Sequence, residues 1–170
     1  MKKKSILFVC MLLIAMLITS TTAFATSTVH KEKSKSTYVT VEVTNLATGA
    51  VTKESMKAGT WYLYATATYG GTNDAYPVSI GANNLYYNET YISAGGYYRG
   101  SPTETTSSKT DALGNKTSIT LNYSRPAGVK YATRASKADA SVSPANYSYG
   151  STSGSTKDIT LSFSITCNKK

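Results

Sequence analysis

Apolar and polar residues alternate with a period of two through much of the chain. The alternation is clearest in residues 38–45, 60–69, 116–123 and 156–167, and the last of these pairs apolar positions with serine and threonine. Because successive side chains of a strand point to opposite faces, each segment is predicted to be a strand with one face in a core. No segment has apolar residues at helical spacing over three turns, and the alanine-rich stretch 130–140 is the only ambiguous case. The pattern therefore predicts an all-β protein.

Turn-forming residues divide this pattern into about seven or eight short strands, which is typical of an antiparallel β-sandwich. We expect a single sandwich domain over residues 37–170, immunoglobulin-like or similar. Alternation, rather than continuous apolar runs, disfavours a parallel sheet. Pro77 cannot donate to a strand ladder, so the segment 76–80 is predicted to lie at a sheet edge. The polar stretch 100–115 is expected to be a long loop or a mobile excursion.

The first 25 residues have the order of a cleavable secretory signal peptide. Lys2, Lys3 and Lys4 precede a nearly unbroken apolar run over residues 6–18, and Ala23-Phe24-Ala25 supplies small residues at positions −3 and −1 of a cleavage site. The apolar run is shorter than the roughly 20 residues that a membrane-spanning helix needs. We expect cleavage after Ala25 and a secreted, extracellular protein. Residues 26–36 are polar and charged and are expected to be a flexible lead-in.

Charge gives a weaker indication of a partner. Removal of residues 1–25 leaves 15 basic and 9 acidic residues, a net charge of +6. A positive surface attracts anionic polymers, including cell-wall polymers and lipid head groups. The cations are scattered, apart from Lys31, Lys33 and Lys35 and the pair Lys169-Lys170, so solubility is the favoured interpretation. An anionic membrane or cell-wall polymer is the alternative partner, and no nucleic-acid partner is predicted.

Groups that carry catalysis are scarce. His30 is the only histidine and falls in the predicted lead-in, so the folded part has no imidazole for a nucleophilic triad. Cys10 leaves with the signal peptide, and the alternation predicts that Cys167 points into the core, so no internal disulfide forms. The acidic residues show no spacing that singles out a pair, and the segment 111–115 favours a turn over a calcium loop. No enzyme, metal site or cofactor is predicted.

Aromatic residues are the positive signal. Ten of them fall between Trp61 and Tyr98. Neighbouring strand residues face opposite ways, so adjacent tyrosines cannot all be buried on one side. Tyrosine also favours strands and cross-strand pairs, which makes sheet building the alternative interpretation. In the strand 60–69, Trp61 and Leu63 share the face predicted to be buried, and Tyr62 and Tyr64 share the outward face. The best candidates for ligand binding are therefore Tyr62 and Tyr64, followed by Tyr97 and Tyr98 beside glycine.

Two functions follow as hypotheses. The first is a secreted, non-enzymatic β-sandwich that binds a cell-surface glycan or protein partner through exposed tyrosines. The second is a secreted cationic toxin or bacteriocin-like protein that acts on membranes, because strands that alternate apolar residues with Ser or Thr also occur in membrane-inserting hairpins. The short lysine-rich start and long apolar run of residues 1–25 favour a bacterial source.

Overall fold

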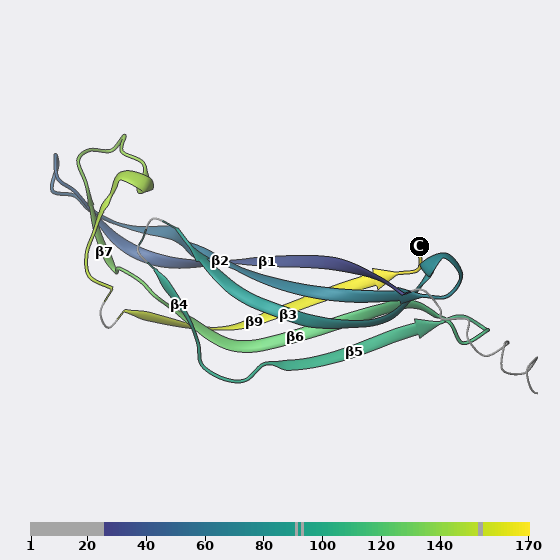
Figure 1. Ribbon diagram of the computed structural model, residues 1–170. Coiled ribbons are helices and arrows are strands. Elements are labelled where there is room, and N and C mark those ends of the chain that lie inside the picture. The colour runs from purple at the N-terminus through teal and green to yellow at the C-terminus, as the bar shows by residue number, and fades with distance from the viewer. Residues whose placement is uncertain (1–25, 91, 93, 153–154) are drawn as a thin grey trace, which may run out of the picture.

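The computed structural model describes residues 26–90, 92, 94–152 and 155–170 and shows an elongated all-β protein (Figure 1). The elements are β1 (Ser27–Asn45), β2 (Val51–Gly70), η1 (Thr72–Asp74), β3 (Tyr76–Glu89), β4 (Gly95–Tyr98), β5 (Thr103–Thr110), β6 (Lys116–Lys130), β7 (Arg134–Lys137), η2 (Pro144–Asn146), β8 (Ser148–Tyr149) and β9 (Thr156–Asn168). The predicted all-β class is confirmed. The predicted signal peptide, residues 1–25, lies outside the described residues. Within the described ranges no helix is long and apolar enough to cross a membrane.

The strands form two sheets. Sheet A has the order β3-β2-β1-β7-β8 and is strongly curled. In sheet B the central strand is β6, which pairs with β9 along one edge and with β4 and β5 in succession along the other. The prediction of a purely antiparallel arrangement is wrong for one pair, since Glu42–Asn45 of β1 runs parallel to Arg134–Lys137 of β7. Alternation shows which face of a strand is buried and says nothing of the direction of its neighbour.

The core lies between the two sheets and follows the predicted alternation. Trp61 and Leu63 of β2 and Leu121 of β6 belong to one hydrophobic core cluster, and all three side chains are almost fully buried. Each such side chain stabilises the fold by about 1.5–3 kcal/mol relative to an exposed position. Cys167 of β9 is buried with them, as predicted. Pro77 also lies where expected, in the edge strand β3.

Two polar segments that were not expected to be strands are strands. Residues 27–36, predicted to be a flexible lead-in, form the first half of β1 and pair with β2 from Tyr69 to Thr60. The stretch 100–115 contains β5, whose side chains are all exposed and which pairs with β6. In both cases an existing strand edge supplies backbone partners, so the segment needs no apolar side chains of its own.

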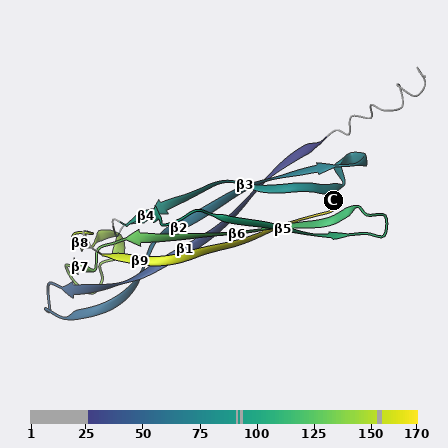
Figure 2. The same cartoon turned by 90° about the horizontal axis from the view of Figure 1, so that it is seen from below.

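The two sheets meet edge to edge along two seams that long side chains bridge. We name the first the β1–β9 seam, where strands β1 and β9 lie side by side (Figure 2). There Lys157 of β9 donates to the carbonyl oxygen of Tyr38 at 2.6 Å. The second, the β3 seam, lies between β3 and sheet B, where Lys116 donates to Val78 O at 2.8 Å. Backbone carbonyls of sheet A thus accept hydrogen bonds from lysine side chains of sheet B at both seams.

Candidate binding surfaces

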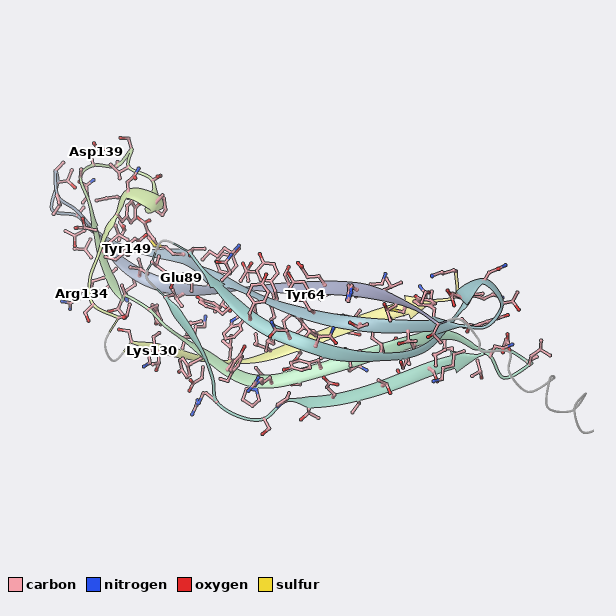
Figure 3. All side chains as sticks on the ribbon, in the orientation of Figure 1. Tyr64, Glu89, Lys130, Arg134, Asp139 and Tyr149 are labelled. Atoms are coloured by element: carbon pink, nitrogen blue, oxygen red, sulfur yellow. The ribbon has the colours of Figure 1, made fainter. Side chains whose placement is uncertain are left out.

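Three tyrosines form a stack on the outer face of sheet A, which we name the tyrosine stack: Tyr62 and Tyr64 of β2 and Tyr86 of β3. The Tyr86 ring centroid lies 5.0 Å from that of Tyr62 and 5.5 Å from that of Tyr64, with interplanar angles of 13° and 10°. Tyr86 is the direct cross-strand partner of Tyr62 and lies diagonally from Tyr64, so strand register alone aligns the rings. Figure 3 shows Tyr64 midway along the length of the molecule.

Hydroxyl groups tie the stack together and to strand β1. The Tyr64 and Tyr86 hydroxyl oxygens are 3.1 Å apart. This hydrogen bond, followed by one to Glu32 of β1, raises the pKa of Tyr64 above its usual range. Beside the stack, His30 Nδ1 lies 3.2 Å from Thr66 Oγ1. The stack is therefore a neutral aromatic surface whose hydroxyls and polar neighbours can exchange hydrogen bonds with a partner.

Tyr97, a predicted ligand-binding residue, is held away from this stack. Its hydroxyl donates to Asp158 Oδ1 at 3.0 Å, and Asp158 also forms an ion pair with Arg99. Its ring lies over Gly128, where a Cβ atom would come within 2.5 Å of the ring. Tyr97 is fixed against strands β6 and β9 by these contacts.

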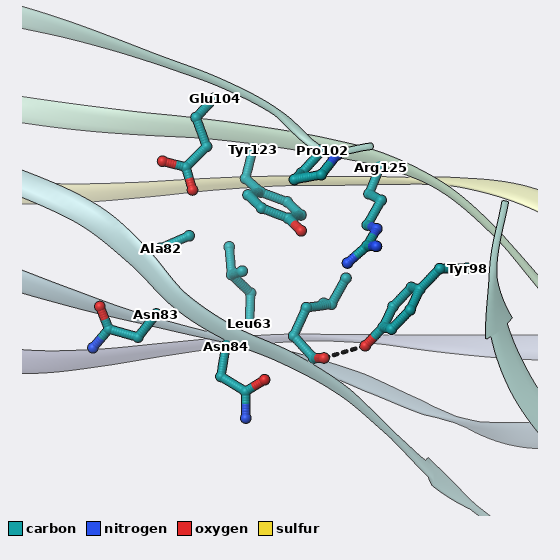
Figure 4. A pocket seen from close by; sticks show the side chains of 10 residues that line it. Leu63, Ala82, Asn83, Asn84, Tyr98, Pro102, Glu104, Tyr123 and Arg125 are labelled. Carbon is teal, nitrogen blue, oxygen red and sulfur yellow. Dashed lines mark hydrogen bonds between the residues drawn. The ribbon is translucent and has the colours of Figure 1, made fainter. Parts of the chain in front are cut away.

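Tyr98, the fourth predicted residue, lines a cleft at the β3 seam. Its ring lies 5.8 Å from that of Trp61, its hydroxyl donates to Leu85 O, and the Arg125 guanidinium sits 3.7 Å above its ring centroid. Burial raises the pKa of Tyr98. The cleft has a volume of about 310 Å³, at the lower end of the range for small-ligand sites (Figure 4).

Acidic, basic and neutral polar side chains surround this cleft. Glu104, Tyr123 and Arg125 extend into it from sheet B, while Asn83 and Asn84 lie on the β3 side (Figure 4). The register between β2 and β3 shifts at this point, and such bulges commonly redirect side chains beside binding sites. The Glu104 carboxylate has no hydrogen-bond or ion-pair partner among the residues that the structure describes. The cleft therefore offers an acceptor carboxylate and a donor guanidinium.

The four predicted tyrosines thus occupy three different surroundings. Tyr62 and Tyr64 lie together, whereas Tyr97 and Tyr98 lie on opposite sides of the short strand β4. The sequence did not single out Tyr86, because the register of β3 against β2 cannot be read from alternation. It also missed Arg125 and Glu104, which only the fold brings to the cleft.

Metal-binding chemistry is not found in the described part of the chain. It holds no group of three or more His, Cys, Asp or Glu side chains that could bind a metal ion. The segment 111–115 is a turn, as predicted: Asp111 Oδ1 accepts hydrogen bonds from the backbone N–H groups of Leu113 and Asn115, both at 2.9 Å. Gly114 has a φ of 82°, which favours glycine.

Comparison of the chain with protein-family models, with curated proteins and with solved structures found no match.

Proposed function

We propose that this is a secreted, non-enzymatic protein that binds a cell-surface glycan or protein partner through the tyrosine stack. We further infer that its two sheets are a β-sandwich, immunoglobulin-like or similar, in which sheet A is strongly curled. The observation that carries the functional proposal is the stacking of Tyr62, Tyr86 and Tyr64 on an outer sheet face.

The composition of this face supports a binding role. Strand positions on either side of the stack, such as Ser34 and Thr66, are small and polar, as expected of a solvated sheet face. Three large rings in the midst of such residues leave apolar surface in contact with water. Cross-strand pairing alone accounts for one tyrosine pair at the register Tyr62–Tyr86 and does not require a third ring.

The geometry of the stack also supports it. Each ring is held by its neighbour, so little side-chain entropy remains to be lost when a partner binds. Parallel rings with hydroxyls at their edges offer apolar contact and hydrogen bonds together. A sugar or a protein side chain is recognised by this combination.

Retention on purified cell walls tests the proposal. The double substitution Tyr62→Ala with Tyr86→Ala removes two of the three rings, and Tyr38→Ala is the matched control because Tyr38 is an exposed tyrosine on β1, distant from the stack in the β1–β2 register. We expect the double variant to lose at least about tenfold in affinity, and the control to bind as the unmodified protein does. Circular dichroism and thermal unfolding establish that each variant folds. Undiminished retention of a folded double variant overturns the proposal.

A further inference from the structure

The core-facing side of β1 changes character halfway along the strand. Val39, Val41 and Val43 in the second half are at most 2% exposed. On the same side of the first half stand three lysines, of which the first is half-buried and the other two are exposed: Lys31, Lys33 and Lys35. Their register partners in β2 are buried core residues: Ala65, Leu63 and Trp61. Lysines therefore occupy positions at which alternation places core residues.

These lysines lie along the β1–β9 seam, and two more lysines join them there. Lys35 Nζ lies 3.5 Å from Thr160 O of β9, and Lys157 of β9 bonds to Tyr38 O. At the start of β1, Lys170 Nζ lies 3.5 Å from Ser27 Oγ. We name this set the lysine track: Lys31, Lys33, Lys35, Lys157 and Lys170. It follows β1 from Ser27 to Tyr38.

No carboxylate among the described residues forms an ion pair with a lysine of the track. Ion pairs in the described part of the chain use other cations, in the pairs Arg99–Asp158, Arg134–Glu42 and Lys137–Glu54. Glu32 lies between track residues in sequence, but strand alternation places it on the opposite face of β1, where it bonds to Tyr64. The seam thus carries a row of uncompensated ammonium groups.

Two structural roles explain why charged residues lie along the seam, but they do not explain why all of these residues are positively charged. Aliphatic lysine stems cover the margin of the core while the charged ends reach water. Charged side chains also protect an exposed strand edge from pairing with other chains. Either role is met by residues of both signs or by fewer charges. An unbroken row of one sign points to a ligand of the opposite sign.

We propose that the lysine track binds a linear polyanion that carries regularly spaced phosphate groups. Alternate residues of a strand lie about 6.5–7 Å apart, so the three track lysines of β1, Lys31, Lys33 and Lys35, follow one another at even intervals along the strand. Each ammonium group has three donors, and those that contact a carbonyl oxygen keep donors for a phosphate. A single row of this kind suits a flexible chain of phosphates better than the flat surface of a bilayer.

The site is separate from the tyrosine stack, and the proposal does not rest on the proposed function. The track lies along the β1–β9 seam, whereas the stack lies on the outer face of β2 and β3. The Tyr62→Ala, Tyr86→Ala variant is therefore expected to bind polyphosphate as tightly as the unmodified protein does. Failure of one proposal leaves the other standing.

Binding of inorganic polyphosphate, measured by calorimetry at several salt concentrations, tests the track. The triple variant Lys31→Gln, Lys33→Gln, Lys35→Gln is compared with Lys53→Gln, Lys109→Gln, Lys130→Gln, which removes the same charge from exposed lysines on other strands. We expect the track variant to lose at least about tenfold in affinity at low salt and its salt dependence to become shallower. The control is expected to lose much less, and replacement of the three track lysines by arginine is expected to preserve binding.

Four results would overturn the proposal. The first is that the unmodified protein does not bind polyphosphate. The second is that the two triple variants lose affinity equally, which would make net charge the sole cause. Binding to vesicles of anionic lipid without binding to polyphosphate would assign the track to membranes. If the glutamine variant aggregates, the arginine variant decides: loss of binding in a monodisperse arginine variant contradicts a charge-based site.

Discussion

The Lys137 ammonium lies 2.9 Å from Glu54 Oε1 and joins strand β7 to strand β2. Tyr147 completes the cluster, since its hydroxyl donates to Glu54 Oε2 at 3.1 Å and lies 3.3 Å from Lys137 Nζ. Both charged side chains are mostly buried, at 15% and 27% exposed. A charge removed from water in this way stabilises a fold only when it is paired and hydrogen-bonded, as Glu54 is. The cluster holds the segment from β7 to β8 against the end of sheet A.

Stability is expected to fall in acid because of Glu54. The hydrogen bond from Lys137 is the largest of the effects that hold the pKa of Glu54 below its usual value of 4.5. A carboxyl whose pKa is lowered by folding stabilises the protein above its unfolded pKa, and that stabilisation is lost as the pH falls through the folded pKa. Glu54→Gln should therefore lower the melting temperature at pH 7 and flatten its decline between pH 5 and pH 3, a range set by the reference pKa of glutamate. Calorimetric unfolding across this range measures both effects, and an unchanged acid decline in the variant contradicts the assignment.

Substitution of Gly96 by alanine is expected to destabilise the fold. The Tyr87 ring packs so close to Gly96 that a Cβ atom there would lie 2.5 Å from the ring. Tyr87 is itself fixed between Gly96, Gly59 and the Trp61 ring, whose centroid is 4.8 Å away, so it has little room to move. Overpacking of this kind costs about 1–3 kcal/mol. Chemical denaturation measures the loss.

Gly95 provides the matched control for this substitution. A Cβ atom at Gly95 meets no atom within 4 Å, and its backbone needs no positive φ. Gly95→Ala should leave the free energy of unfolding within about 0.5 kcal/mol of the unmodified value. Equal destabilisation by the two alanines would place the cause in the β4 backbone and not in the Tyr87 ring.

Cys167 is expected to resist modification in the native protein. Its side chain is 1% exposed and lies near the C-terminal end of β9. Burial of the Tyr69 hydroxyl raises the pKa of Tyr69, and a hydrogen bond between Tyr69 and Cys167 raises it further. Alkylation by iodoacetamide, followed by mass spectrometry of the peptide that contains Cys167, should be slow in buffer and fast in denaturant. Rapid alkylation in buffer would show that the end of β9 opens locally.

Alternation predicted the core well and the surface less well. It identified Trp61, Leu63 and Cys167 as buried because burial on one face imposes a period of two. It could not show that β1 extends back to Ser27, since that half is held by backbone pairing and lysine stems. The parallel pairing of β1 with β7 could not be predicted either, because parallel and antiparallel strands show the same alternation of apolar and polar residues.

The candidate sites, too, could be predicted from the sequence only in part. Tyr62 and Tyr64 were identified from their outward positions on one strand. Tyr86 joins them through register, which depends on the bulge near Asn83, and a single inserted residue reverses which side chains share a face. The contact of Arg125 with Tyr98 depends on how the two sheets meet, which no local pattern in the sequence records.

The hydrogen bond between Tyr64 and Tyr86 gives the tyrosine stack a titration signature. Because the bond to Tyr86 is the largest cause of the raised pKa of Tyr64, Tyr86→Phe should bring that pKa down while the rings stay stacked. Glu32→Gln should lower it by a smaller amount. Tyr87, whose pKa is raised to about 12 mainly by burial, serves as the internal reference and should not respond to either change. Carbon-13 NMR of ring-labelled tyrosine in alkaline solution measures each pKa, and an unchanged Tyr64 pKa in Tyr86→Phe contradicts the shared hydrogen bond.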